Sequence, residues 1–144
     1  ASSTPWSILR IDFPFRSDPF PRPDIVRKTI ANIQKGYPLF TDHHFGPTFI
    51  DDFVKVIDWV IRTKATGLWH ASSGESWTDY DLGKLLNEHF QLGLDVKAGS
   101  LAEYLKTTNR PYQKNTALNA EKLKEALDFS LSSIDTAIKL VVIE

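Results

Sequence analysis

The sequence predicts a single α/β or α+β domain in which about five helices separate about four short strands. Two patterns carry this prediction. Apolar residues recur at helical spacing in several stretches, and short β-rich segments lie between these stretches. A length of 144 residues, with 42% hydrophobic and 24% charged residues, suits one globular domain with a substantial core.

The first quarter of the chain predicts a strand, a loop and a helix. Residues 7–13 (Ser-Ile-Leu-Arg-Ile-Asp-Phe) are β-rich and mostly apolar, as expected of a strand that is covered on both faces. Residues 16–23 contain three closely spaced prolines, which predict a surface loop or an extended arm. Isoleucines at helical spacing then predict a helix that begins near residue 25 and ends at Gly36.

The next segment raises the question of a metal site. Residues 38–42 predict a short strand, with His43 and His44 at its exposed end. Neighbouring residues of an extended segment point to opposite faces, and the sequence has neither cysteine nor His-Glu-x-x-His spacing. We therefore interpret these two histidines, together with His70 and His89, as surface residues and expect no metal ligands.

A turn, a strand and a helix follow within about twenty residues. Gly46-Pro47 predicts a turn, because glycine admits positive φ and proline lacks a backbone donor. Residues 48–50 predict a short strand, and Asp51 or Asp52 is expected to cap the helix that follows. The apolar residues of this helix recur at helical spacing: Phe53, Val56, Ile57, Val60 and Ile61.

The second half of the chain predicts further elements of both kinds. A strand over 68–71 ends in a turn at Ser72-Ser73-Gly74, and Thr78 or Asp79 caps a helix that Gly93 closes. Four segments follow: a weaker helix over 101–106, an extended run over 110–118, a helix over 120–127 capped by Asn119, and a final helix from Ser132 or Ser133.

Composition bounds the kinds of partner. The net charge of −1 gives no electrostatic reason to expect nucleic acid or an anionic membrane. No apolar run reaches the roughly twenty residues that span a bilayer, so we expect a cytoplasmic protein with no membrane partner. The chain has no methionine, which leads us to expect that it is a piece of a longer protein.

The residues themselves indicate no catalytic group. Ser72 and Ser73 lack the Gly-x-Ser-x-Gly frame of a nucleophile elbow, and no glycine-rich phosphate loop is present. Nucleotide cofactor binding is therefore not expected of this chain alone. Phe13 and Phe15 follow the first strand and can offer aromatic faces to a sugar or base, while Arg110 can hold a phosphate or carboxylate. The alternatives are core packing for the two phenylalanines and a surface salt bridge for Arg110.

Four stretches, read together, resemble the C-terminal part of the dTDP-4-dehydrorhamnose reductase family, a branch of the extended short-chain dehydrogenase/reductases. Residues 8–15 (ILRIDFPF) resemble the family's ILRTSWVY, and residues 46–54 (GPTFIDDFV) resemble SPTYAxDLA. Residues 67–74 (GLWHASSG) resemble GIYHLxxxG. Residues 110–123 resemble RPxxSxLxxxKL. Order and spacing agree across nearly the whole chain.

This resemblance implies that residues 1–144 are the substrate-binding part of an NAD(P)-dependent nucleotide-sugar reductase or epimerase with a Rossmann-like fold. In the family an N-terminal half carries the glycine-rich dinucleotide loop and the Tyr-x-x-x-Lys pair. Tyr104 is not followed by lysine at that spacing, so the resemblance implies that this chain alone is inactive. The implied partners are a nucleotide-sugar, NAD or NADP held mainly by the missing half, that half itself, and a second copy in a homodimer.

The resemblance also assigns site residues. Phe13 matches a tryptophan that packs against the sugar, while Ile11 and Asp12 fall where the backbone approaches the nicotinamide. Phe15, Thr48 and Arg110 are the further candidates for substrate contact, with Arg110 expected at the diphosphate. For Thr48 the alternative is a structural role in the turn.

Two other interpretations remain open. The first is a non-catalytic regulatory or scaffold protein on the same fold, as the regulatory subunit of methionine adenosyltransferase is in this family. The departures at Asp12, Phe13 and Pro14 from the family's serine or threonine, tryptophan and valine favour it. The second is an unrelated small domain that shares short motifs by chance.

Overall fold

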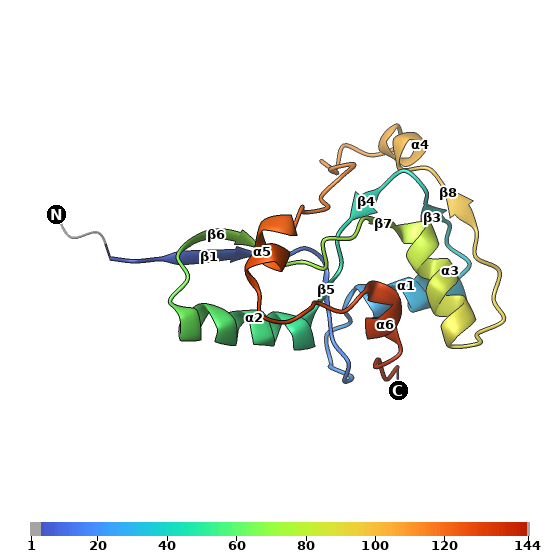
Figure 1. Cartoon of the computed structure of the whole chain (residues 1–144). Coiled ribbons are helices and arrows are strands. Elements are labelled where there is room, and N and C mark those ends of the chain that lie inside the picture. The colour runs from blue at the N-terminus through green and yellow to red at the C-terminus, as the bar shows by residue number, and fades with distance from the viewer. Residues whose placement is uncertain (1–3, 144) are drawn as a thin grey trace.

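The structure is a computed structural model that describes residues 4–143 (Figure 1). Its strands are β1 (Ser7–Arg10), β2 (Pro14–Phe15), β3 (Leu39–Phe40), β4 (His44–Phe45), β5 (Thr48–Phe49), β6 (Gly67–His70), β7 (Trp77–Thr78) and β8 (Ala98–Gly99). Its helices are α1 (Ile25–Gln34), α2 (Ile50–Thr63), α3 (Asp79–His89), α4 (Leu101–Leu105), α5 (Glu121–Ala126) and α6 (Ile134–Ile138).

The strands pair two by two, and every partner is remote in sequence. β1 pairs in parallel with β6, with Ser7 opposite Gly67 and Arg10 opposite His70. β2 pairs in parallel with β5 and β3 with β8, whereas β4 and β7 are antiparallel. Four small two-stranded sheets result, so the loops between the strands bring distant segments together.

Two apolar clusters hold these elements together. The larger lies among β2, β4, β5, α1, α3 and α6 and includes Phe15, Phe45, Phe49 and Leu86. The smaller packs α2 and α5 with the β1–β6 pair around Val56, Trp59 and Leu123. In Figure 1, α2 runs alongside the β1–β6 pair, and α3, α1 and α6 lie at the other end of the molecule.

The expected helices are present, and several of the expected caps are confirmed. The Thr78 side chain accepts a hydrogen bond from the Asp81 amide at the start of α3, and Ser133 accepts one from Thr136 at the start of α6. Asn119 accepts from the Glu121 amide at 2.9 Å, one position before the N-cap of α5. These contacts are local, which is why the sequence patterns identified them.

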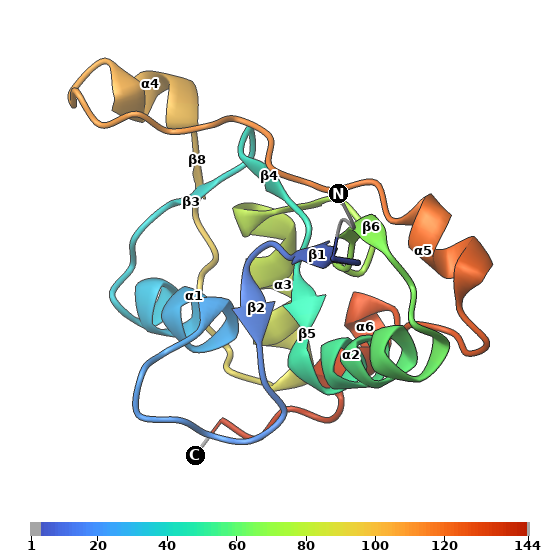
Figure 2. The same ribbon diagram turned by 90° about the vertical axis from the view of Figure 1, so that its left-hand side faces the viewer.

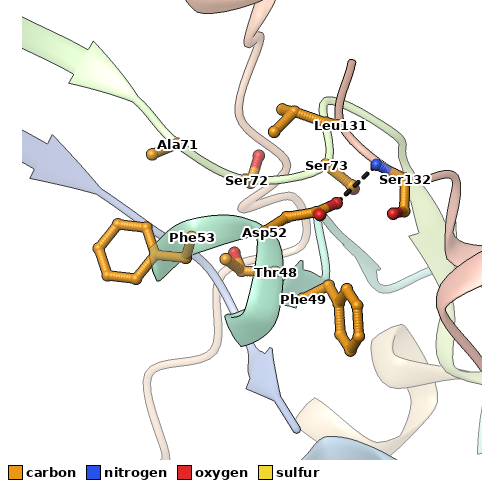
Figure 3. Close-up of a pocket in the computed structure, with 9 residues that line it drawn as sticks. All are labelled: Thr48, Phe49, Asp52, Phe53, Ala71, Ser72, Ser73, Leu131 and Ser132. Carbon is orange, nitrogen blue, oxygen red and sulfur yellow. Dashed lines mark hydrogen bonds between the residues drawn. The ribbon is translucent and has the colours of Figure 1, made fainter. Parts of the chain in front are cut away.

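The expected cap of α2 is wrong. The helix begins at Ile50 with Phe49 as its N-cap, and no side chain of the described residues caps it. Asp52 is instead buried, and its carboxylate accepts a hydrogen bond from the Ser132 amide at 2.6 Å and pairs with Lys55 at 3.0 Å. The reason is tertiary: the segment before α6 approaches the helix here and supplies a donor that the local sequence does not reveal (Figure 3).

β1 also differs from expectation. It was expected to be covered on both faces, but Ile8 is 52% exposed and the opposite Leu68 of β6 is 41% exposed. Leu9 and Trp69, on the other face, pack into the smaller cluster. Within residues 4–143, β1 therefore has one covered face, one bare apolar face and one edge without a strand partner.

Candidate functional site

The turn after β1 is held by the side chain of Asp12. Its Oδ2 atom accepts hydrogen bonds from the Gly46 amide and from the Thr116 hydroxyl, both at 2.8 Å. Three segments that are far apart in sequence therefore meet at one carboxylate. Two charge-assisted bonds of this kind fix the direction in which the chain leaves β1.

Thr48 completes this junction from β5. Its hydroxyl donates to the Asp12 carbonyl at 2.7 Å and accepts from the Asp12 amide at 3.1 Å. The residue is 2% exposed, so its polar atom is satisfied within the chain. The structure thus gives Thr48 the structural role that sequence analysis weighed against substrate contact.

Two cavities open on either side of this turn. One, of about 360 Å³, is lined by residues that include Arg10, Ile11, Asp12 and Thr116. The other, of about 490 Å³, is lined by Phe13 together with the loop before α1 and the first turn of that helix. Both volumes lie in the range of small-molecule sites, roughly 300 to 1,000 Å³. The expected cofactor residues thus line one cavity, and the expected sugar-contact residue lines the other.

Phe13 is positioned by an unusual backbone conformation. Its φ of 35° lies in the left-handed region, which phenylalanine rarely adopts. The ring is half-buried and lies 4.8 Å from the Phe45 ring and 5.9 Å from the His43 ring, centroid to centroid. Strained backbone that the surroundings hold in place is frequent at functional sites.

His43 is the residue that sequence analysis misplaced. It was expected at an exposed strand end, yet it is 8% exposed and its Nδ1 atom lies 2.6 Å from Asp79 Oδ2. The hydrogen bond to Asp79 raises the pKa of the His43 imidazole above its usual value, because it stabilises the charged form. The ring also stacks on Phe45, so His43 supports the aromatic pair that includes Phe13. Asp79 comes from the start of α3, and no local pattern connects it to His43.

The remaining expected site residues lie elsewhere. Phe15 is 1% exposed and stacks on Phe49 at 5.3 Å within the larger cluster, which leaves it no free face for a ligand. Arg110 is exposed and lies in the segment after α4, the helix that projects from the body in Figure 2. It lines neither of the two cavities described above. The structure therefore brings together Ile11, Asp12, Phe13 and Thr48, and it does not place Phe15 or Arg110 with them.

A small cavity between the start of α2, the turn after β6 and the segment before α6 is structural. Figure 3 shows Thr48, Asp52, Ser72 and Ser132 around it, and its volume is about 10 Å³. A space of this size holds about one water molecule. The buried serines of the 72–74 turn therefore have no substrate-sized space beside them here.

Neither a metal centre nor a membrane span is found in the part of the chain that the structure describes. No three histidine, aspartate or glutamate side chains among residues 4–143 gather closely enough to hold a metal ion. No helix among these residues has the length and apolar character needed to cross a bilayer.

Comparisons with known proteins place this geometry in a class. No protein-family model matches the sequence, and no curated protein matches it. Solved structures do: the chain has the fold of the C-terminal part of extended short-chain dehydrogenase/reductases, and its structural neighbours include dTDP-4-dehydrorhamnose reductases and related enzymes.

Three neighbours show the extent of the match. The dTDP-4-dehydrorhamnose reductase of Bacillus anthracis in complex with NADP is 16% identical, with a TM-score of 0.77, and the match covers 92% of this chain and 46% of that chain. The orthologue from Clostridium acetobutylicum is 18% identical with a TM-score of 0.74, over 92% and 46%. The UDP-glucose 4-epimerase of Thermus thermophilus in complex with NAD is 15% identical with a TM-score of 0.69, over 95% and 45%. The chain thus spans less than half the length of these enzymes.

Proposed function

We propose that this chain is the substrate-binding lobe of an NAD(P)-dependent nucleotide-sugar reductase or epimerase, and that a dinucleotide-binding half completes it. The observation that carries the proposal is the asymmetric structural match, which takes in 92% of this chain but only 46% of the B. anthracis reductase. Such enzymes divide their work: one half holds the nicotinamide, and the other orients the substrate against it.

The open side of β1 supports this proposal. Among residues 4–143, only β6 pairs with β1, so the other edge of β1 has no strand partner there, and Ile8 and Leu68 expose apolar surface next to it. Sheet edges of this kind are normally paired or covered, because they otherwise invite aggregation. A dinucleotide-binding half whose sheet continues beyond β1 would satisfy both the edge and the apolar face.

The proposed roles of the site residues follow from their places around the turn after β1. Phe13 contacts the sugar, since its ring lines the 490 Å³ cavity beside the turn. Ile11 and Asp12 lie toward the nicotinamide, and Thr48 holds Asp12 in place through its hydroxyl. Arg110 is proposed as a diphosphate contact that reaches the substrate from the segment after α4.

Cofactor binding tests the proposal. We expect the longer protein that contains this chain to bind NADPH or NADH with micromolar affinity and to transfer hydride to a nucleotide-linked keto-sugar. Residues 1–144 alone should show no such affinity, because no glycine-rich phosphate loop is present in them. Micromolar NADPH binding by residues 1–144, measured by calorimetry, would contradict the division of work proposed here.

Arg110 has a test of its own. In the longer protein, Arg110→Ala should weaken nucleotide-sugar binding by about 1 to 3 kcal/mol, the usual range for loss of a hydrogen bond to a charged group. Lys114→Ala, which removes a charge from the same exposed segment, is the matched control. Equal affinities in the wild type and the Arg110 variant would return Arg110 to a surface role.

A non-catalytic scaffold on the same fold is the second candidate. The observation that favours it concerns Asp12. Its carboxylate accepts hydrogen bonds from Gly46 and Thr116, which gives it a structural role in the turn and not a catalytic one. The same cofactor experiment separates the candidates. A scaffold would keep nucleotide binding without hydride transfer, and its upstream half would lack the Tyr-x-x-x-Lys pair.

A further inference from the structure

Residues 110–118, which we call the strap, form an extended segment between α4 and α5. In Figure 2 this segment runs from the projecting α4 back across the body of the molecule to α5. Residues 109–115 are all exposed, so few apolar contacts fix this part of the strap. A small number of polar contacts therefore decide where it lies.

The middle of the strap is joined to β4 at one residue. The His44 amide donates to the Lys114 carbonyl at 2.8 Å, and the Thr116 amide donates to the His44 carbonyl at 2.9 Å. His44 and Asn115 form a single parallel bridge, which is shorter than any of the named strands. One bridge contributes little by itself, because even two full strands that pair in isolation are only marginally stable in water. Further contacts are needed to hold the strap in this register.

Asp12 provides such a contact from the turn after β1. Its Oδ2 atom accepts a hydrogen bond from the Thr116 hydroxyl at 2.8 Å, across 104 positions of sequence. The same oxygen accepts from the Gly46 amide at 2.8 Å. A Cβ atom at position 46 would lie 3.4 Å from the Leu118 amide nitrogen, so the glycine permits the strap to pass this close. Asp12 therefore anchors the strap at the point where it crosses the turn.

The hydrogen bond between Asp12 and Thr116 also joins two walls of one cavity. The end of β1 and the turn after it form one wall of the 360 Å³ cavity, and residues 113 and 115–118 of the strap form the other. At the far end of the strap, the Tyr112 ring meets the Tyr104 ring of α4 edge to face at 6.0 Å. Arg110 lies between these two anchor points and α4, next to Pro111, whose φ is fixed. A change at Thr116 is therefore transmitted along a short segment to Arg110.

From these contacts we propose that Asp12 is a positioning residue for Arg110: by binding Thr116, its carboxylate fixes the strap and thereby the place from which Arg110 reaches an anionic group of the substrate. The inference rests on the proposed function for the role of Arg110, and it adds a residue that acts through Arg110. A carboxylate suits this task, because one of its oxygens accepts both hydrogen bonds and each of them is charge-assisted.

Amide hydrogen exchange in the 144-residue chain tests whether Asp12 holds the strap. Thr116→Val keeps the shape of the side chain but removes the hydroxyl. We expect the amides of His44 and Thr116 to exchange roughly threefold faster or more in this variant, since the strap then detaches more often. Thr116→Ser keeps the hydroxyl and should exchange as the wild type does. Thr107→Val is the matched control, because its hydroxyl donates to the Tyr104 carbonyl within the end of α4. Amides within α1 should be unaffected in every variant.

Nucleotide affinity of the longer protein tests whether the strap acts through Arg110. UDP and dTDP are titrated separately by calorimetry, and the nucleotide that binds more tightly is used for the variants. Thr116→Val should weaken binding by roughly threefold to tenfold, and Thr116→Ser should restore the wild-type affinity. Combined with Arg110→Ala, Thr116→Val should add almost nothing to the loss, since its effect passes through Arg110. Asp12→Ala should weaken binding at least as much as Thr116→Val, and the two together no more than Asp12→Ala alone.

Three results would overturn the inference. Wild-type exchange of the His44 and Thr116 amides in Thr116→Val would show that the hydroxyl does not hold the strap. Additive losses of affinity in Thr116→Val and Arg110→Ala would show that the strap does not act through Arg110, and unchanged affinity in Arg110→Ala would leave nothing for Asp12 to position.

Failure of the proposed function gives a different result. If the longer protein bound neither UDP nor dTDP, the proposed function and the positioning of Arg110 would both be rejected. Faster exchange in Thr116→Val would still establish Asp12 as the anchor of the strap. The two failures are therefore distinguishable.

Discussion

At the scale of single residues, the turn after β1 depends on polar side chains whose hydrogen-bonding groups are satisfied within the chain. Thr48 satisfies both the amide and the carbonyl of Asp12, and Asp12 in turn binds Gly46 and Thr116. Buried polar groups of this kind matter mainly because their loss leaves partners unsatisfied. The sequence motifs single out Thr48 and Asp12, but only the structure shows the hydrogen bonds between them.

The Thr48 hydroxyl is open to a direct test of stability. Thr48→Val keeps the shape of the side chain but removes the hydroxyl, so the Asp12 amide and carbonyl lose their partner. We expect the free energy of unfolding to fall by about 1 to 3 kcal/mol in urea denaturation. Thr48→Ser keeps the hydroxyl and should lose much less. Equal stability of the valine variant and the wild type would show that water replaces the hydroxyl.

The His43–Asp79 pair makes stability depend on pH. The hydrogen bond that His43 donates to the Asp79 carboxylate raises the pKa of folded His43 above the ordinary value of 6.5, which the unfolded chain retains. The pair therefore contributes its full stabilisation below pH 6.5 and loses it as pH rises through the folded pKa. Asp12 and Asp42 add smaller attractions in the same direction, whereas burial opposes them.

We compare the free energies of unfolding of the wild type and Asp79→Asn between pH 6 and 9. Above about pH 6.5, we expect the wild-type value to fall relative to that of the variant. The comparison is made by urea denaturation at each pH. The other three histidines are present in both proteins, so their titration cancels to first order. A stability difference that stays constant across this range would show that His43 is not charged in the folded state.

At the scale of elements, the helices lie where local patterns predicted them, whereas each strand depends on pairing with a segment that is remote in sequence. The boundaries of α1, α3 and α6 follow from apolar spacing and from the capping side chains of Asp24, Thr78 and Ser133. The strands β2 to β5 and β7 to β8 are two residues long and exist only because a distant strand pairs with them. Strand pairing has no local signature of that length, which is why the sequence patterns predicted the regions of β1, β3, β5 and β6 but neither the other four strands nor any of the pairings.

The loop between β2 and α1 is an element whose order depends on one arginine. The Arg27 side chain is 14% exposed and joins Asp24, the carbonyls of Arg16 and Asp18, and the carbonyl of Val142 near the C-terminus. Arg27→Ala would leave these acceptors without a partner and should lower the free energy of unfolding by about 2 to 4 kcal/mol in urea. Lys139→Ala removes an exposed pair with Asp135 and should cost about 0 to 1 kcal/mol. Similar losses in both variants would mean that solvent replaces the contacts of Arg27.

At the scale of the whole molecule, one side has its apolar surface covered and the other leaves part of it exposed. The larger apolar cluster is enclosed by three helices and short strands, whereas β1 has, within the described part of the chain, one edge without a strand partner and one exposed apolar face. This asymmetry agrees with a match that takes in less than half of each neighbouring enzyme. The proposal of a completing half makes a specific statement about the amides of β1.

Amide hydrogen exchange of β1 tests whether a completing half pairs with this strand. In residues 1–144 alone, the amides of β1 that point away from β6 should exchange rapidly, because no strand accepts from them. In the longer protein the same amides should be protected by pairing with the completing half. Two amides at the ends of the β1–β6 pair serve as the internal control: that of Gly67, which donates to the Trp6 carbonyl at 2.9 Å, and that of Ala71, which donates to the Arg10 carbonyl at 2.7 Å. Equal exchange of the outward amides in both proteins would mean that the edge stays open and that the sheet does not continue.

The sequence by itself determined the helices, the N-caps of α3 and α6, the aromatic and acidic residues after β1 and the likeness to the reductase family. These features depend on spacing within about a dozen residues, where backbone geometry and side-chain chemistry act locally. Only the tertiary structure decided that His43 is buried against Asp79, that Asp52 serves Ser132 instead of the helix end, and that Asp12 binds Thr116. Each of these contacts joins residues between 36 and 104 positions apart, so it arises from packing between elements and leaves no pattern in the local sequence.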